Sequence, residues 1–374
     1  MSDKEDHGLL RDSVAKFLGA RYDIERRREI AASEAGWSRD IWREMAELGL
    51  FAAAIPAEAG GFAQGIEEAL VVMEEFGRRL VVEPFSETAI VAGTLIAKLG
   101  TAAQRSDLLP PIMAGDAIWA LAHEEGYANG ADDVRTVAIP EGEEYRIDGA
   151  KAVAAAAGWA DRLLVSARIG AAGDGALALF IVDPQAAGVG IERYRTLDGR
   201  GAADISLSGV LVPAGALLGA GGDACAALGD AVDFAVAAQC AEALGIMSVL
   251  NAATVEYAKV RQQFGQPIGR FQALQHRLVD MYVAESEARG MAATLPALFG
   301  MANRRSAAVS AAKVQIAEAG RLIAEEAIQI HGGMGMTQEL SIGDYAKRMI
   351  ALTMQHGDVR AHLDRFVALE MEAA

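Results

Sequence analysis

Cysteine is scarce in this sequence, which contains only Cys225 and Cys240 among its 374 residues. Neither belongs to a Cys-x-x-Cys pair or lies near histidines at metal-ligand spacing, so the sequence predicts no disulfide framework and no metal site. Both lie in alanine-rich segments, where a free thiol behaves as a small hydrophobic side chain. We therefore expect two unpaired, buried cysteines.

Long apolar runs are also missing, although 52% of the residues are hydrophobic and the mean hydropathy is +0.19. The longest apolar stretches are rich in alanine and interrupted by charge, and none suits the ~20 residues that span a bilayer. The opening segment 1–7 is polar and acidic, without the basic and apolar regions of a secretory signal. These absences predict a cytoplasmic protein that does not enter a membrane.

Basic residues are outnumbered, with 34 lysines and arginines against 51 aspartates and glutamates and a net charge of −17. This charge opposes binding to nucleic acid, because that affinity comes largely from neutralising phosphates. A local basic pocket for a phosphate-bearing cofactor remains compatible with it. The high apolar content favours self-association or a partner subunit, which would cover hydrophobic surface.

The spacing of apolar residues divides the chain into three segments. From about Lys4 to Gly115 they recur at steps of three and four, which predicts helices. Pro110-Pro111 is one of the places where we expect these helices to break. Between 117 and 218 the period changes to two, in short runs separated by glycine and aspartate turns, which predicts a small antiparallel sheet or barrel.

The helical period returns after residue 224 in four long segments with few helix breakers: 233–261, 271–298, 304–330 and 342–371. Long alanine-rich helices suit a bundle, since small residues let helix axes approach closely. We therefore predict an α+β protein of three domains: an N-terminal helical domain (1–115), a middle antiparallel β-domain (116–218) and a C-terminal four-helix bundle (219–374).

Two glycine-containing motifs lie in the last segment. Residues 261–268 read Arg-Gln-Gln-Phe-Gly-Gln-Pro-Ile, at the end of a predicted helix. Such a place can present the guanidinium of Arg261 to a phosphate, although an ordinary helix end with one charged side chain gives the same pattern. Residues 329–337 read Gln-Ile-His-Gly-Gly-Met-Gly-Met-Thr, in which Gly332-Gly333 can end a helix or let a ligand approach the backbone.

In this order, the two motifs resemble the paired signatures of the acyl-CoA dehydrogenase family of flavoproteins. Segments 42–50, 55–61, 180–183, 196–200 and 210–214 resemble further elements of the family, so the resemblance covers nearly the whole chain. It implies the acyl-CoA dehydrogenase fold and bound FAD. In the family the first motif meets the pyrophosphate and adenosine half of FAD, and the second, from a neighbouring subunit, holds the adenine and ribose side. The resemblance thus assigns FAD contacts to Arg261, Phe264, Gln272, Gln329, Gly332 and Gly333.

The implied reaction is the α,β-dehydrogenation of an acyl-CoA thioester. A carboxylate base removes the α-proton while the β-hydrogen leaves as hydride to the flavin. The family's base is a glutamate at a fixed distance beyond the Gly-Gly turn, or near the start of the helix that ends in the first motif. Those positions are occupied by His356 and Ala235, so the usual base is absent.

Three explanations stay open. His356 is a candidate base, because an imidazole with an unperturbed pKa near ~6.5 can accept a proton, but a histidine at a helix end also has a structural interpretation. Glu242 lies two helical turns after Ala235 on the same face, where desolvation would raise its pKa. Its alternative is an ion-paired helix residue, and Asp358 is a weaker candidate. In the third explanation, the chain is a subunit without its own base.

The middle segment also departs from the family. The Trp-Ile-Thr element that covers the flavin is replaced by Val153-Ala154-Ala155. The family's Thr-Glu-x-Gly-x-Gly-Ser-Asp loop is only echoed by 123–126 and by Asn129-Gly130-Ala131-Asp132. Eroded flavin elements beside retained adenosine elements resemble partner subunits of α2β2 dehydrogenases that act on bulky acyl-CoAs, such as steroid side chains or dicarboxylates.

We therefore predict FAD-dependent dehydrogenation of an acyl-CoA, by this chain alone or as one subunit of a heteromer, with an electron-transfer flavoprotein as electron acceptor. The predicted assembly is a homo-oligomer or an α2β2 heterotetramer with a second acyl-CoA dehydrogenase chain. The alternative is a non-catalytic subunit that completes the FAD site of its partner.

Overall fold

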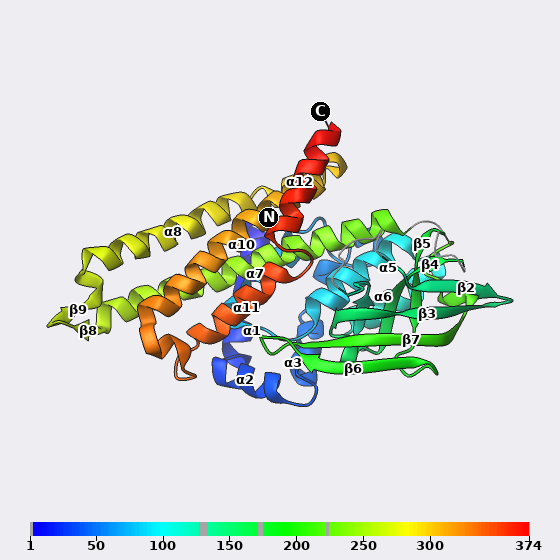
Figure 1. The fold of residues 1–374 in the computed structure, drawn as a ribbon, viewed down its shortest axis with the longest axis horizontal. Coiled ribbons are helices and arrows are strands. Elements are labelled where there is room, and N and C mark those ends of the chain that lie inside the picture. The colour runs from blue at the N-terminus through cyan, green and yellow to red at the C-terminus, as the bar shows by residue number, and fades with distance from the viewer. Residues whose placement is uncertain (1–2, 127–133, 171–174, 222–223, 374) are drawn as a thin grey trace. The chain divides into compact units, whose positions relative to one another are not determined.

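A computed structural model describes residues 3–126, 134–170, 175–221 and 224–373. The chain forms two compact units (Figure 1). The helical unit comprises Met1–Arg28, Gly65–Val81 and Val236–Ala374, and the sheet unit comprises Glu29–Gln64 and Val82–Ala235. The three predicted domain boundaries stay a prediction.

The helical unit contains the predicted bundle. Its helices are α1 (Asp3–Arg21), α4 (Glu67–Arg79), most of α7 (Cys225–Val260), α8 (Gln272–Ala292), α9 (Leu295–Phe299), α10 (Ala302–His331), α11 (Ile342–Met354) and α12 (Val359–Ala373). The helix α10 contacts α8, α11 and α12. Two of the four predicted helices are each split in two. Pro296 lies in the first turn of α9, and left-handed backbone at His356 (φ +57) and Gly357 (φ +100) separates α11 from α12.

Two glycines bring α4 and α7 into backbone contact within the helical unit. A Cβ added at Gly77 of α4 would overlap the carbonyl oxygen of Glu242, and one at Gly245 of α7 would overlap that of Glu74. A larger residue at either place would force the helices apart, because backbone atoms cannot move aside as a flexible side chain can. Near Glu242, this close approach fixes how far α7 is shifted along its axis relative to α4 and how it is rotated about that axis.

The sheet unit holds α3 (Arg39–Glu47), α5 (Gly93–Leu99) and α6 (Ala102–Met113), whereas α2 (Ile24–Ala32) has residues in both units. Its strands are β1 (Trp119–Ala122), β2 (Val137–Glu141), β3 (Glu144–Ala155), β4 (Arg162–Ile169), β5 (Leu177–Val182), β6 (Val189–Arg195) and β7 (Gly201–Pro213). The described strands pair in the order β1-β4-β2-β3-β7-β6, with β5 also paired to β4. Most pairings are antiparallel, as predicted, but β1 and β2 each pair with β4 in parallel.

A local signal explains the start of α6. Thr101 and Gln104 form a reciprocal capping box at its start. At its other end the helix continues through Pro110 and Pro111 to Met113, so the predicted break there is wrong. The carbonyls of both prolines still accept backbone hydrogen bonds, from Ala114 and Asp116 at 2.9 Å. The helix therefore lacks only the hydrogen bonds that two N–H groups would have donated at these positions.

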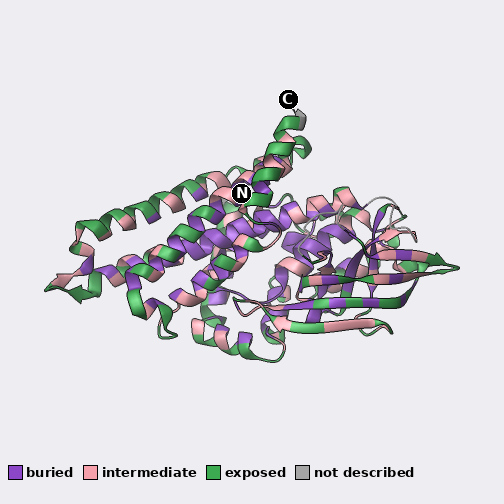
Figure 2. Cartoon of the chain, in the orientation of Figure 1, coloured by how far each residue is buried: buried purple, intermediate pink, exposed green. Residues whose placement is uncertain are grey.

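Buried residues run along α7 and α10 and through the strands (Figure 2). In the sheet unit one apolar cluster joins residues of α5, α6 and the strands, including Leu95, Ile112, Trp119, Leu164 and Leu179. Cys240 is buried as predicted, but Cys225 is only half-buried, because it lies in the first turn of α7.

The helix α7 is, among the described residues, the one helix long and apolar enough to cross a membrane on length and composition. This corrects the expectation that no segment reaches that level. Of its most apolar 18-residue window, 83% is buried inside the protein, as is usual for a core helix.

Candidate functional site

The last turn of α7, which leads into the first motif, packs against the end of α10, which carries the second motif. The ring of Tyr257, in the last turn of α7, stacks on the ring of His331 at the end of α10, with centroids 4.3 Å apart. The Tyr257 hydroxyl also donates to the carbonyl oxygen of His331 at 3.4 Å. The first motif begins four residues after Tyr257, and His331 lies inside the second. This stack therefore joins segments that are more than seventy positions apart.

The first motif forms a small hairpin after α7. Strands β8 (Gln262–Gln263) and β9 (Gln266–Pro267) pair, and the backbone of Phe264 (φ +54) and Gly265 (φ +77) makes the turn. The side chain of Phe264 is 91% exposed and meets the ring of Phe271 edge to face, at 6.1 Å between ring centroids. An aromatic ring held open at a hairpin tip is placed for a contact outside this unit.

The second motif ends α10 with an open backbone. Gly332 has φ +61 and ψ −140, a conformation accessible essentially to glycine alone. A Cβ added at Gly332 or at Gly333 would meet no atom within 4 Å. The turn therefore leaves room for another molecule to approach its backbone.

All six predicted FAD contacts are exposed: Arg261, Phe264, Gln272, Gln329, Gly332 and Gly333. They supply a guanidinium, two side-chain amides, an aromatic ring and an open glycine turn. This set fits the phosphates and adenosine of FAD, since guanidinium groups bind phosphate and aromatic rings stack on a base. Their assignment to FAD stays a prediction.

Glu242 lies in the interior of the helical unit. Its carboxylate accepts hydrogen bonds from Nε and Nη2 of Arg348 on α11, each at 2.7 Å. Arg348 also donates through Nη1 to Oε1 of Gln355 at 3.3 Å. This is the geometry of the ion-paired helix residue that the sequence left open, and it favours that interpretation over a catalytic one.

His356 belongs to the tight link between α11 and α12. Nζ of Lys313 donates to the carbonyls of Leu352 and Gln355 at 2.5 and 3.0 Å, and Nε2 of His362 lies 3.0 Å from the carbonyl of His356. Buried Lys313 therefore holds the link in place, and burial lowers its pKa to about 8. The backbone of His356 is fixed, and its imidazole remains a candidate base.

The other weak candidate, Asp358, caps a helix. Its Oδ1 accepts from the backbone N–H of Ala361 at 2.9 Å, at the start of α12. Asn129-Gly130-Ala131-Asp132 lie outside the described residues.

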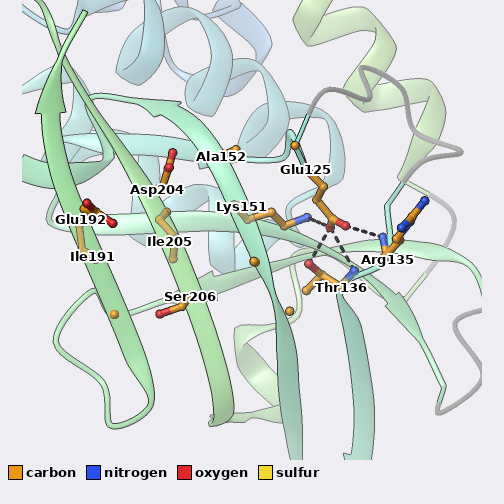
Figure 3. A pocket seen from close by; sticks show the side chains of 14 residues that line it. Glu125, Arg135, Thr136, Lys151, Ala152, Ile191, Glu192, Asp204, Ile205 and Ser206 are labelled. Atoms are coloured by element: carbon orange, nitrogen blue, oxygen red, sulfur yellow. Dashed lines mark hydrogen bonds and ion pairs between the residues drawn. The ribbon is translucent and has the colours of Figure 1, made fainter.

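The sheet unit contains a cavity of about 1080 Å³ (Figure 3). At one end the Glu125 carboxylate accepts from Lys151 Nζ at 2.6 Å, from Thr136 Oγ1 at 2.6 Å, and from the backbone N–H groups of Arg135 and Thr136. Glu192, Asp204 and Ser206 lie across it, on β6 and β7. Sequence reasoning missed this cavity, because it depends on how the strands curl.

Burial shifts the pKa values of the titratable side chains at this end of the cavity. Burial lowers the pKa of Lys151 to about 8, although Glu125 works against the shift. The pKa of Glu125 is lowered, because hydrogen bonds from Lys151 and Thr136 outweigh the effect of its burial. His123 Nδ1 lies 2.9 Å from Ser166 Oγ, and burial together with the charge of Lys151 lowers the pKa of His123 to about 4.

Family models for the N-terminal and the C-terminal domain of acyl-CoA dehydrogenase match residues 4–116 and 228–365. The chain belongs to the acyl-CoA dehydrogenase family. The probable acyl-CoA dehydrogenase YngJ of Bacillus subtilis (strain 168) is 30% identical over 97% of both chains. The predicted fold is confirmed, and so is FAD as the cofactor of the family.

Two solved structures of similar fold contain two different chains by name. A variant of the Tcur3481-Tcur3483 steroid ACAD is 32% identical, with a TM-score of 0.87 over 99% of each chain. The ChsE4-ChsE5 complex from Mycobacterium tuberculosis is 25% identical, with a TM-score of 0.88 over 100% of this chain and 98% of that one.

Proposed function

We propose that this chain takes part in the FAD-dependent α,β-dehydrogenation of an acyl-CoA thioester, alone or as one subunit of a heteromeric dehydrogenase. The observation that carries the proposal is the Tyr257–His331 stack, which holds the helix end that leads into the first motif against the helix end that carries the second. It gathers a guanidinium, amides, an exposed aromatic ring and an open glycine turn at one end of the helical unit. Such a set recognises a dinucleotide that carries phosphates and an adenine.

In this proposal the residues of the chain bind and orient the cofactor. Arg261 pairs with phosphate, and Phe264 and the amide of Gln272 contact the adenosine half of FAD. The second motif acts across a subunit boundary, where Gln329 contacts the adenine and ribose side and Gly332 and Gly333 let the backbone approach it. Bound FAD supplies the hydride acceptor for the β-hydrogen. The α-proton requires a base, and His356 is the candidate that occupies the position of the family's glutamate beyond the Gly-Gly turn.

A second candidate function is that of a non-catalytic subunit that completes the FAD site of a partner chain. The buried Glu242–Arg348 pair favours it, because it removes the best alternative carboxylate from proton transfer. Similarity to chains of two-chain complexes supports a heteromer, and the name of one of them supports a bulky acyl-CoA such as a steroid side chain. An electron-transfer flavoprotein remains the proposed electron acceptor.

Purification of the chain alone, followed by its visible spectrum and anaerobic bleaching by a panel of acyl-CoAs, tests the proposal. Bound flavin that bleaches supports an autonomous enzyme. A colourless chain that gains flavin and activity only with a second family chain supports the heteromer. Flavin binding by neither preparation would contradict both functions.

The variant His356→Asn tests the base. Asparagine tolerates the left-handed backbone of this position but cannot accept the proton, so folding should persist while the bleaching rate falls by about 10²-fold or more. Glu242→Gln should bleach at the wild-type rate once folded protein is selected. An unchanged rate in His356→Asn would show that the imidazole is not the base.

A further inference from the structure

Arg28 of α2 holds the segment that follows the glycine turn of the second motif. Nη1 donates to the carbonyl oxygen of Gln338 at 2.8 Å, and Nη2 donates to that of Leu340 at 3.4 Å. Nε and Nη2 donate to Oδ2 of Asp344 at 3.2 and 2.6 Å, and Nη1 also donates to Oε1 of Glu25 at 2.9 Å. A guanidinium has five N–H groups, and Arg28 uses each of them within the helical unit.

These hydrogen bonds join segments that are distant in sequence. Arg28 and Asp344 are 316 positions apart, and α2 lies beside the connection from α10 to α11 (Figure 1). The side chains of the pair are only 22% and 17% exposed, so salt screens their attraction less than that of an open surface pair. Two of the bonds go to backbone carbonyls. Arg28 therefore fixes the main chain itself, whatever side chains stand at positions 338 and 340.

The glycine turn needs such support, because packing does not hold it. A Cβ added at Gly332 or at Gly333 would meet no atom within 4 Å. The turn is instead anchored at its two ends, by the stack of Tyr257 on His331 before it and by Arg28 after it. A turn that meets a ligand through its backbone has to be held within about 0.5 Å of the productive geometry.

We propose that Arg28 is a positioning residue for the second motif, which holds the exit of the glycine turn where its backbone meets FAD. The N–H groups of Arg28 are all engaged within the helical unit, so none is left for the cofactor, and its effect passes through the turn. The inference rests on the proposed function and deepens it, since it makes the affinity for FAD depend on a residue far from both motifs in the sequence.

The variant Arg28→Lys separates positioning from charge. Lysine keeps a positive charge beside Asp344, but its single nitrogen cannot occupy the places of Nη1 and Nη2 at once. Urea unfolding should stay close to that of the wild type. The dissociation constant for FAD, measured by flavin fluorescence on the assembled protein, should rise about tenfold. Arg28→Gln should lose both stability and FAD affinity, whereas a purely structural ion pair would affect stability alone.

Hydrogen exchange of the amides in 332–341, measured without FAD, reports on the turn directly. Exchange there should be faster in both Arg28 variants than in the wild type, because the segment opens more readily. Arg11→Gln is the matched control, since Arg11 on α1 forms ion pairs with Glu74 and Glu75 of α4 at 3.0 and 2.9 Å. This control should leave exchange in the turn and FAD affinity unchanged.

A double-mutant cycle with Gly333→Ala tests whether Arg28 acts through the turn. The added methyl group meets no protein atom within 4 Å and stands where the cofactor would approach, so FAD affinity should fall while the fold persists. Combined with Arg28→Lys, the loss should be smaller than the product of the two separate factors, because both act on one contact. With Arg261→Gln in the first motif, the two factors should multiply instead.

Two outcomes would overturn the inference, and they are distinguishable. If the wild type binds FAD and both Arg28 variants bind it equally well, Arg28 is a structural residue only, while the proposed function stands. If no wild-type preparation binds FAD, alone or with a second family chain, the proposed function is contradicted and the inference fails with it.

Discussion

Glu242 and Arg348 form a bidentate ion pair in the interior of the helical unit, where their exposed fractions are 0% and 3%. The pair connects α7 with α11 across 106 positions of sequence. Both carboxylate oxygens of Glu242 are engaged by a charged donor, which stabilises the ionised form and occupies the lone pairs that a proton acceptor needs. Glu242 thus has the side chain of a base and the surroundings of a structural residue.

Breaking this pair from one side should be costly. Arg348→Met leaves the Glu242 carboxylate buried without its cation, and the free energy of unfolding should fall by about 3–5 kcal/mol. Urea unfolding measures the loss. Replacing both residues by apolar ones of similar size should restore much of the stability, because no uncompensated charge remains. The exposed pair Arg321–Glu325 on α10 is the control, and its removal should have little measurable effect.

Substitutions at the two glycines where α4 and α7 touch test the close approach of these helices. Gly245→Ala puts a methyl group against the carbonyl oxygen of Glu74, and Gly77→Ala puts one against that of Glu242. Each should lower the free energy of unfolding by about 1–3 kcal/mol or more. Gly290→Ala on α8 meets no atom within 4 Å and should stabilise the helix by about 0.5–1 kcal/mol. Equal effects at Gly245 and Gly290 would contradict the close approach.

Sequence and structure agree where one residue type dictates the local backbone. Gly332 was readable in advance because its left-handed backbone requires glycine, and the helical bundle because its apolar period is sustained over many turns. The strand β7 lies within the segment 117–218 that was predicted to form strands, and its alternating burial from Ile205 to Leu207 follows the apolar alternation of that segment.

Pairings between distant segments could not be read from the sequence. The stack of Tyr257 on His331 and the ion pair of Glu242 with Arg348 depend on the rotation of helices about their axes, which no local pattern reports. The backbone of Val153 (φ +51) could not be predicted either, since valine favours extended backbone and a register shift between β3 and β7 imposes a left-handed one. Half of the candidate site therefore follows from motifs, and the other half from tertiary structure.

Stability should depend on the protonation of His123. Burial, with the charge of Lys151, lowers its pKa in the folded protein to about 4, against about 6.5 in an unfolded chain. Between these values the unfolded state binds a proton that the folded state does not. The stability associated with neutral His123 is therefore fully present above pH ~6.5 and is lost as the pH falls toward 4, by at most about 1.4 kcal/mol per pH unit.

Urea unfolding of the wild type and of His123→Gln across this pH range measures the effect. Carboxylates titrate in both proteins, so the difference between the two curves isolates the imidazole. The difference in the free energy of unfolding between the wild type and His123→Gln should become steadily smaller as the pH is lowered. The wild type loses the contribution of neutral His123, which the variant lacks at every pH. Parallel curves would mean that His123 titrates in the fold as it does in the unfolded chain.

A substitution at Phe264 can test recognition without disturbing the fold, because a side chain that is 91% exposed contributes little to stability. Phe264→Ala should change the free energy of unfolding by no more than about 0.5 kcal/mol. Its FAD content, or its assembly with a second chain, should nevertheless fall, since the ring would lose the contact for which the hairpin holds it open. Leu9→Ala on α1, at another exposed apolar position, should alter neither quantity. Loss of stability without loss of FAD or assembly would make Phe264 a structural residue of the hairpin, and the first motif would then bind through Arg261 and Gln272 alone.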